Sequence, residues 1–403
     1  MWPIDGKEAK KLLGDIIAID SVNPSLVPGG VGERAVAAYI VDYLQGLGLV
    51  SRLDEVVPGR PNAVGVLPAG SDDSEAAREA QGAIGGPLAA KHGLMLNGHI
   101  DTVGTQVMPG RASKARVSGD KIHGRGAFDM KGGVAMGLLA LAAVKRSGVK
   151  LRRSVLFTGV MDEEYASLGT QDIVRRYQAD AAVVMEPTAL TLHLAHKGFA
   201  WVAVETFGRA AHGSNHREGI DAIVKMGKVL VAVEELGRQY LAGEGHPLVG
   251  HPSIHGSIIQ GGRELSTYPD HCTAQFERRT LPAEDPAGAA QEFEKLCAQL
   301  SAADSDFRAR VTLGLTRNGY EVNRDETVVR TLADALTAVA EREPVYGGSA
   351  PWLDSALLGA AGIPTVIFGP EGVGAHADDE WVSLSSVVLG AQVLAETIVR
   401  LCG

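Results

Sequence analysis

The chain has 403 residues, a net charge of −10, a pI near 5.7 and 45% hydrophobic residues. This length suggests two to three domains with sizeable cores, and the acidic balance argues against a nucleic-acid partner. We expect no apolar run to reach the roughly 20 residues that are needed to span a bilayer. The opening residues lack a signal-peptide core, and the three cysteines form no C-x-x-C pair. We therefore expect a cytoplasmic protein with reduced thiols and no membrane partner.

The first part of the chain alternates between helix-like and strand-like segments. Helical patterns cover about 5–19 and 31–48, and apolar strand candidates follow near 62–67 and 94–97. Such alternation predicts an α/β sheet. The polar, Ala- and Gly-rich segment 70–93, between the two strands, is expected to form an insertion loop without an obvious chemical role.

His99 and Asp101 directly follow the strand candidate at 94–97. Residues two apart on an extended backbone point to the same side. Asp101 can therefore hold one ring nitrogen of His99 and leave the other nitrogen free for a metal. The alternative is a strand end that carries two polar residues without further function.

Asp129 lies in the glycine-rich segment 123–133, just before an apolar helical run at 134–144. Glycines allow the backbone to approach a ligand closely. Gly124 and Gly126 also fit part of a dinucleotide-binding fingerprint, but no clean βαβ unit with a later acidic residue surrounds them.

Two further strand candidates end in acidic residues. The segment 154–161 runs into Asp162, Glu163 and Glu164, and three adjacent carboxylates repel one another, which favours a bound divalent cation over a solvated acidic loop. The segment 181–185 ends at Glu186.

Near the C-terminus, the strand-like segment 362–370 is followed by glycines and a histidine. Five candidate ligands thus lie just past candidate strands, where open α/β sheets form their sites. Two histidines with several carboxylates suit zinc or a similar first-row metal, and a bridging carboxylate suits two metals about 3.5–4 Å apart. These candidates are His99, Asp129, Glu164, Glu186 and His376.

The pattern changes near residue 197 to the order β-α-β-β-α-β, which predicts four antiparallel strands packed against two helices. Helix–strand order returns afterwards, so we expect a catalytic domain of 1–196 and 317–403 with 197–316 inserted. The inserted elements are a strand at 199–207, a helix at 219–241, strands at 253–259 and 271–279, a helix at 286–300 and a strand at 309–315.

Taken in this order, the segments resemble the family of dinuclear zinc deacylases and exopeptidases. That family includes acetylornithine deacetylase, succinyl-diaminopimelate desuccinylase, aminoacylase and carboxypeptidase G. The resemblance runs from about residue 5 to the C-terminus. It implies a mixed-sheet, zinc-exopeptidase-like catalytic domain with an inserted α+β, ferredoxin-like domain that acts as lid and dimerisation domain, and therefore a homodimer.

The resemblance also implies two divalent metal ions per subunit, with zinc expected and cobalt an alternative. His99 and Glu186 would hold one ion, and His376 and Glu164 would hold the other. Asp129 would bridge them.

The resemblance gives Asp101 the role of orienting His99 and gives Glu163 the role of general base. It further implies a non-proline cis peptide bond between Asp129 and Met130.

Two residues of the inserted segment acquire substrate roles by resemblance. His212 would cross the dimer interface and donate a hydrogen bond to the developing oxyanion, although by its own sequence it reads as a surface-loop histidine. Arg279 would grip a substrate carboxylate with its planar guanidinium. Arg278 is expected on the opposite, solvated side of the strand.

The most economical substrate is an N-acyl amino acid, because the segments resemble acetylornithine-deacetylase-like members most closely. A carboxypeptidase or dipeptidase acting on short peptides is the alternative within the same chemistry. A third alternative is a metal-free binding protein. The presence of all five candidate ligands and of Glu163 argues against it. Trp352 is expected either to wall an acyl pocket or to pack in a core.

Overall fold

The chain folds into two compact units in this computed structural model, which describes residues 2–70, 91–104 and 115–403. Unit 1 comprises 1–194, 322–347 and 353–403, and unit 2 comprises 195–321 and 348–352. The structure therefore groups 195–196, 317–321 and 348–352 with the inserted segment, whereas the predicted boundaries left them in the catalytic domain. Most of the predicted insertion loop, residues 71–90, lies outside the described residues.

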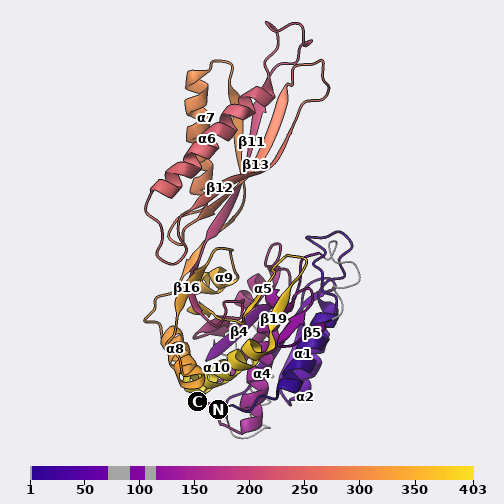
Figure 1. The fold of residues 1–403 in the computed structure, drawn as a ribbon, viewed down its shortest axis with the longest axis vertical. Coiled ribbons are helices and arrows are strands. Elements are labelled where there is room, and N and C mark those ends of the chain that lie inside the picture. The colour runs from indigo at the N-terminus through magenta and orange to yellow at the C-terminus, as the bar shows by residue number, and fades with distance from the viewer. Residues whose placement is uncertain (1, 71–90, 105–114) are drawn as a thin grey trace. The chain divides into compact units, whose positions relative to one another are not determined.

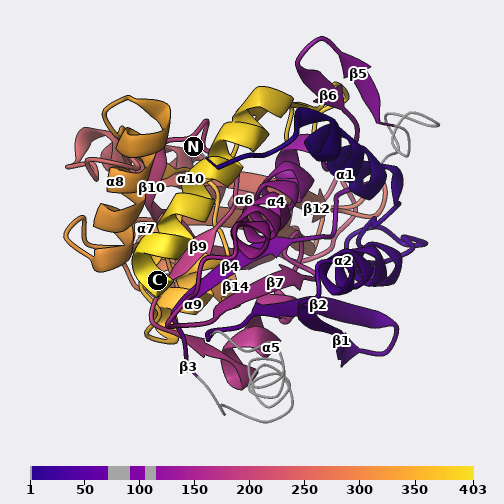
Figure 2. The ribbon, with the colours of Figure 1, turned by 90° about the horizontal axis from the view of Figure 1, so that it is seen from below.

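A nine-stranded mixed sheet organises unit 1 (Figures 1 and 2). Its strand β15 and the last residues of β10 and β16 belong to the residues grouped with unit 2. Strands β7, β4, β9 and β17 run parallel to one another, so their carboxyl ends meet at one edge. The order across the sheet is β1 (Val50–Val57), β2 (Arg60–Leu67), β7 (Val155–Val160), β4 (Leu94–His99), β9 (Ala182–Val184), β17 (Thr365–Ile367), β10 (Leu192–His196) and β15 (Tyr320–Glu321), with β16 (Tyr346–Ser349) paired to β10.

Helices cover both faces of this sheet, because its strands are apolar on both sides. On one face Met95, Leu156 and Val184 pack with Ile173 of α5 and Leu358 of α9. The opposite face is covered by α2, α4 and α10, while α1 and α8 pack against α10 (Figure 2). The helices are α1 (Gly6–Ala18), α2 (Arg34–Gly46), α4 (Gly132–Ser147), α5 (Leu168–Arg176), α8 (Thr327–Ala340), α9 (Ser355–Ala360) and α10 (Leu384–Cys402).

Two helical segments, 127–147 and 384–402, are long and apolar enough to cross a membrane by length and composition. This corrects the expectation that no apolar run was long enough. In the segment 127–147, 89% of the most apolar 18-residue stretch is buried. The segment 384–402 is α10, which packs against both α4 and α8. Packing inside unit 1 therefore accounts for their apolar composition.

A second, smaller sheet was not predicted from the sequence. Its order is β18 (Gly372–Val373), β19 (Trp381–Ser383), β6 (Lys121–His123) and β5 (Arg116–Ser118). The chain passes from β6 into the turn that carries Asp129, and the loop between β18 and β19 carries His376. The small sheet thus joins two distant parts of the sequence that both supply candidate ligands. A short parallel pair, β3 (Lys91–His92) with β8 (Gln178–Ala179), lies elsewhere in unit 1.

Unit 2 confirms the predicted β-α-β-β-α-β order. Its antiparallel sheet has the order β12 (Ser253–Gly261), β13 (His271–Thr280), β11 (Gly198–Phe207) and β14 (Arg308–Arg317). Helices α6 (Ala222–Ala242) and α7 (Gly288–Ala303) cover one face, where Val202, Phe276, Val229 and Phe293 form the core (Figure 1).

Arg278 does not lie on a solvated face, contrary to the sequence-based expectation. It is 3% exposed, on the face covered by the helices. Its guanidinium makes ion pairs of 3.2 Å with both Glu284 and Glu292 and lies 4.2 Å from the centroid of the Tyr240 ring. A buried arginine needs such carboxylate partners, and two acidic residues of the following segment provide them.

Trp352 is buried among residues of unit 2. It is 9% exposed, stacks edge-on against His196 and Phe199, and donates its indole N–H to the carbonyl of Asn318 at 3.0 Å. Of the two roles expected for this residue, the structure supports the packing role.

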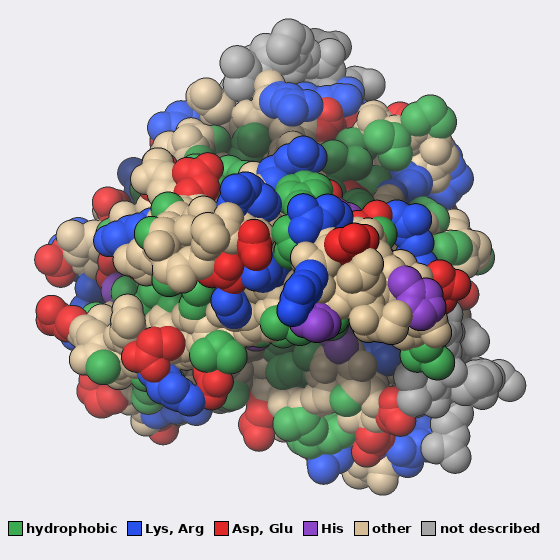
Figure 3. All heavy atoms as spheres, turned by 90° about the horizontal axis from the view of Figure 1, so that it is seen from above, with side chains coloured by type: hydrophobic (Ala, Val, Ile, Leu, Met, Phe, Trp, Pro, Cys, Tyr) green, Lys and Arg blue, Asp and Glu red, His purple; other side chains and the backbone are tan. Residues whose placement is uncertain are grey.

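Unit 2 exposes apolar side chains on β12 and on α6. Ile258 and Ile259 are about half exposed, at 50% and 51%, and Val231 is 68% exposed. Strand β12 is an edge strand of its sheet, so its outer backbone groups have no neighbouring strand among the described residues. On the face of the molecule shown in Figure 3, acidic side chains are interspersed with Lys and Arg side chains, so neither sign covers that face alone.

Candidate metal centre

The candidate ligands of unit 1 converge at the carboxyl edge of the parallel strands. His99 ends β4, and its Nε2 lies 3.0 Å from Asp129 Oδ1 and 3.7 Å from Glu186 Oε1. His376 Nε2 lies 3.0 Å from Glu164 Oε2 and 3.4 Å from Asp129 Oδ2. Asp129 therefore stands between the two histidines and presents one carboxylate oxygen to each.

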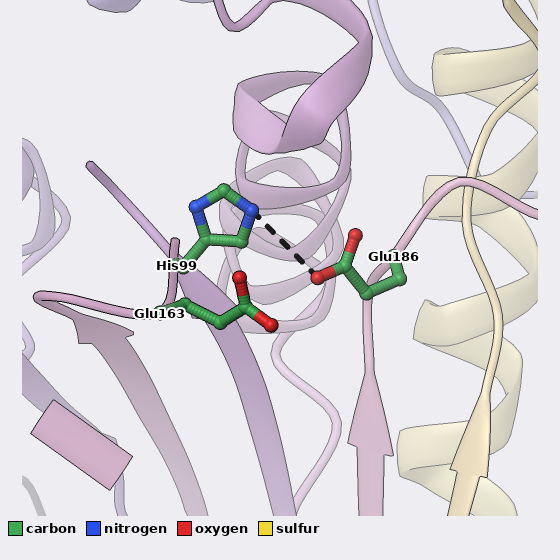
Figure 4. Close-up of side chains that lie close together, drawn as sticks. All are labelled: His99, Glu163 and Glu186. Atoms are coloured by element: carbon green, nitrogen blue, oxygen red, sulfur yellow. Dashed lines mark ion pairs between the residues drawn. The ribbon is translucent and has the colours of Figure 1, made fainter. Parts of the chain in front are cut away.

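Glu163 enters the same space. Ligand atoms of His99, Glu163 and Glu186 all lie within 4.8 Å of one another, as do those of His99, Asp129 and Glu164. Figure 4 shows the carboxylates of Glu163 and Glu186 pointing toward the imidazole of His99 from different strands. So many carboxylates at this spacing repel one another unless positive charge lies among them.

Burial and close contacts shift the pKa values of the residues at this site. Burial raises the pKa values of Glu163, Glu164 and Glu186. Hydrogen bonds to Asp129 and Glu164 raise the pKa of His376 to about 10. Burial thus favours the neutral form of the three glutamates, and the neighbouring carboxylates favour protonation of His376. Binding of divalent cations would displace such protons.

One unpartnered atom supports a fit to metal ions. Glu164 Oε1 is buried and has no hydrogen-bond partner within the described chain. Leaving a buried acceptor unsatisfied costs about 1–3 kcal/mol, and a coordinated cation would satisfy it. Imidazole nitrogens together with carboxylate oxygens form a donor set that zinc and neighbouring first-row metals accept. The residues present therefore fit two divalent ions that share Asp129.

Asp101 contacts the site through two different groups. Its backbone carbonyl lies 3.0 Å from His99 Nδ1, whereas its carboxylate lies 3.5 Å from that nitrogen. The carboxylate instead accepts the backbone N–H groups of Glu163 (3.1 Å) and Glu164 (3.2 Å). The Asp101 carboxylate thus fixes the turn that carries Glu163 and Glu164. Of the Asp101 atoms, its main-chain oxygen lies closest to the His99 imidazole.

A buried polar cluster beneath the acidic turn was missed by the sequence analysis. Asn23 donates to Asp101 (2.8 Å) and to Asp162 (3.0 Å), and Arg60 also contacts Asp162 at 3.1 Å. Glu33 accepts from Arg60 Nε at 2.9 Å. The one signal in the sequence for this cluster is Arg60, which begins the apolar strand β2. An arginine that is buried with such a strand requires carboxylate partners.

The turn that carries Asp129 begins at Gly126, whose φ of 79° is a left-handed conformation that glycine adopts without penalty. The Asp129–Met130 peptide bond is cis, as the family resemblance implied. Helix α4 starts immediately afterwards at Gly132.

His212 and Arg279 belong to unit 2. His212 is exposed, and its Nδ1 lies 2.8 Å from the hydroxyl oxygen of Ser214 and 3.3 Å from the backbone nitrogen of the same residue. Arg279 donates to Glu277 at 2.6 Å and lies 5.4 Å from the centroid of the Phe199 ring.

Comparison with known proteins confirms the resemblance drawn from the motifs. Residues 95–400 match the family model described as peptidase family M20/M25/M40. The acetylornithine deacetylase of Myxococcus xanthus is 29% identical over 324 residues, covering 79% of this chain and 83% of that protein. N-formyl-4-amino-5-aminomethyl-2-methylpyrimidine deformylase of Bacillus subtilis (strain 168) is 26% identical, covering 93% of this chain and 91% of that protein.

Solved structures confirm the mixed α/β fold. Aminopeptidase PepT from Bacillus cereus ATCC 10987 aligns with a TM-score of 0.77 at 17% identity, covering 99% of both chains. The M20 family metallo-carboxypeptidase Sso-CP2 from Sulfolobus solfataricus aligns with a TM-score of 0.74 at 18% identity, covering 98% of this chain and 99% of that one.

Proposed function

Because the chain belongs to peptidase family M20/M25/M40, we propose that it is a metal-dependent amidohydrolase that removes the acyl group from N-acyl amino acids. The observation that carries this proposal is Asp129, which lies between His99 and His376 with Glu163 beside them. The names of the two relatives described above, a deacetylase and a deformylase, support deacylation over peptide cleavage.

The proposed metal centre uses the five candidate ligands in two sets. His99 and Glu186 would hold one ion, His376 and Glu164 would hold the other, and Asp129 would bridge. Zinc is the proposed metal and cobalt the alternative, since both accept nitrogen and oxygen donors at this ratio. Bound ions would supply Lewis acidity, which lowers the pKa of a coordinated water and polarises the amide carbonyl.

Side chains of unit 1 would transfer the proton of the attacking water and hold the ligands in place. Glu163 would take a proton from the attacking water and return it to the leaving amine. Asp101 would hold Glu163 and Glu164 through their backbone N–H groups and orient His99.

Unit 2 would supply the substrate contacts. His212 would donate through Nε2 to the developing oxyanion of a neighbouring subunit's active site, a role supported by the engagement of Nδ1 with Ser214. Arg279 would bind the substrate α-carboxylate in a bidentate manner after exchanging its contact with Glu277.

We also propose that unit 2 serves as lid and dimerisation domain of a homodimer. The exposed apolar side chains on the edge strand β12 and on α6 support this, because such an edge in a soluble protein is normally covered. The acidic net charge supports a cytoplasmic enzyme acting on small molecules, without nucleic-acid or membrane partners.

Metal removal followed by a substrate panel tests the proposal. Demetallated protein should lose hydrolysis of N-acetyl amino acids, and zinc or cobalt should restore it. The panel should contain N-acetylornithine, N-succinyl-diaminopimelate, other N-acetyl and N-formyl amino acids, and dipeptides. Full activity after rigorous demetallation would refute the metal-dependent reaction, and hydrolysis of dipeptides alone would identify a peptidase instead.

A further inference from the structure

Glu380 is a buried carboxylate that lies shortly after His376 in the sequence and is 1% exposed. Its Oε1 accepts the backbone N–H groups of Phe128 (2.9 Å) and Asp129 (3.1 Å), and its Oε2 accepts the N–H of Gly126 (2.9 Å). One side chain from the C-terminal part of the protein thus fixes the backbone on which the bridging carboxylate is mounted.

Arg125 completes the link between the two ligand-bearing segments. It is 5% exposed, and its Nη1 donates to Glu380 Oε2 at 2.8 Å. Its Nη2 donates to the carbonyl of Ala377 at 3.1 Å, next to His376. The same two segments also pair as strands, with His123 of β6 opposite Trp381 of β19.

Stability alone is a weak reason for this buried ion pair. Desolvation of two charges offsets most of their attraction, and well-packed apolar side chains of similar size would serve stability as well. The partners of these hydrogen bonds are informative. Glu380 binds backbone groups of the turn that carries Asp129, and Arg125 binds a backbone group of the loop that carries His376; neither side chain binds the interior of a helix. The pair therefore fixes how far Asp129 lies from His376.

We propose that Arg125 and Glu380 are positioning residues for the metal pair. They fix the position of Asp129 relative to His376, and thereby set the affinity for the ion held by His376 and Glu164. This inference rests on the proposed function, because it presupposes that the protein binds two ions. Neither side chain would touch the substrate. Partners of this kind, one step removed from the ligands, typically change metal affinity or activity by about 10–100-fold when they are replaced.

Two conservative variants test the proposal without removing the buried side chains. Arg125→Lys keeps the positive charge beside Glu380 but cannot donate to Glu380 and Ala377 in the fixed geometry of a guanidinium. Glu380→Gln keeps the shape but turns one accepting oxygen into a donor that faces backbone N–H groups. Isothermal titration of the demetallated proteins with zinc, together with cobalt absorption spectra, gives the two stepwise dissociation constants.

In Arg125→Lys we expect one of the two stepwise dissociation constants to rise about 10-fold or more and the other less than about 3-fold, because the variant disturbs the position of His376 and not that of His99. Glu380→Gln should weaken both ions, because Asp129 contributes to both. Matched controls are Arg146→Lys and Glu8→Gln, an exposed pair at 2.6 Å whose Arg146 lies at the far end of α4, about 20 Å from Asp129. Both controls should bind the two ions as the wild type does.

Unchanged dissociation constants in both site variants would overturn the positioning role. So would loss of the thermal transition in demetallated Arg125→Lys, because the pair would then serve folding. If Glu380→Gln alone fails to fold, Arg125→Lys decides the question. A wild-type protein that binds fewer than two ions would refute the proposed function, and with it this inference. A wild type with two ions but no deacylase activity would refute only the substrate assignment.

Discussion

Two adjacent glutamates at the end of β7 have different partners. Glu164 contacts His376 at 3.0 Å, whereas Glu163 faces the space between His99 and Glu186. Side chains of neighbouring residues point in different directions, so the same chemical group can serve as a ligand at one position and as a base at the next. The difference between the two is therefore testable with identical substitutions.

Glu163→Gln should reduce kcat by about 10²–10⁴-fold and leave metal content close to wild type, because an amide cannot accept the proton of the attacking water. Glu164→Gln should lower the affinity for one ion, because it removes a charged ligand. Metal analysis of both purified variants, alongside kinetics at saturating zinc, checks the pair of expectations. Equal metal loss in the two variants would contradict these roles.

A buried histidine of unit 1 should make stability depend on pH. Burial lowers the pKa of His92 to about 4, below its usual value in an unfolded chain of about 6.5. Because the unfolded state then binds the proton more tightly, stability is fully present above about pH 6.5 and is lost as the pH falls toward 4. The loss reaches about 3 kcal/mol.

His92→Gln should therefore be less sensitive to acid than the wild type. Denaturant midpoints measured at intervals from pH 7 to pH 4.5 check this, and the stability difference between wild type and variant should shrink as the pH falls. The exposed residue His216 offers the matched control His216→Gln, which should leave the pH profile unchanged. Parallel profiles for wild type and His92→Gln would rule out this source of acid sensitivity.

At the scale of elements, the site depends on how closely α4 approaches the end of β9. A Cβ atom at Gly133 would lie 1.8 Å from the carbonyl oxygen of Met185, the residue before Glu186. No side chain fits at this distance. The glycines that follow Asp129 therefore allow the start of the helix to lie directly against the strand end that carries a ligand.

Gly133→Ala should accordingly destabilise the protein by about 1–3 kcal/mol or more, because α4 and β9 must move apart. It should also reduce metal affinity, since Asp129 and Glu186 flank the contact. The matched control is Gly14→Ala within α1, where the nearest atom to a new Cβ is 3.9 Å away. That control should stabilise the protein by about 0.5–1 kcal/mol. Calorimetry should show that Tm falls below the wild-type value in Gly133→Ala and rises above it in Gly14→Ala.

At the scale of the whole molecule, the proposed dimer makes each active site depend on two chains. His212 is far in sequence from every candidate ligand and belongs to unit 2, whereas Glu163 belongs to unit 1. If His212 acts in the neighbouring subunit, a chain lacking it and a chain lacking Glu163 complement each other. The heterodimer then contains one complete site.

Mixing His212→Ala with Glu163→Gln, each inactive alone, should restore about a quarter of wild-type activity, because half of the dimers are mixed and each has one complete site. Labelled chains should first establish that subunits exchange, and light scattering should establish the dimer. Exchange without recovered activity would mean that His212 serves its own chain or has no part in the reaction.

The sequence by itself predicted the strands that precede most of the candidate ligands, the residue types of the site and the family, but not the small sheet of β18, β19, β6 and β5. Strand periodicity and the polar residues that end each strand predicted β4, β7 and β9, and with them His99, Glu163, Glu164 and Glu186, because the side chain after a buried parallel strand lies at the sheet's carboxyl edge. The β-α-β-β-α-β order of unit 2 was also readable, since its strands alternate between one buried and one open face.

Only the tertiary structure decided which groups far apart in the sequence meet. Strand β6 pairs with β19 across more than half of the chain, so neither Glu380 nor Arg125 could be assigned to Asp129 in advance. The burial of Arg278 and the proximity of Asn23 to Asp101 and Asp162 were equally hidden. Charged and amide side chains carry no periodic signal, because their burial depends on partners that other elements bring to them.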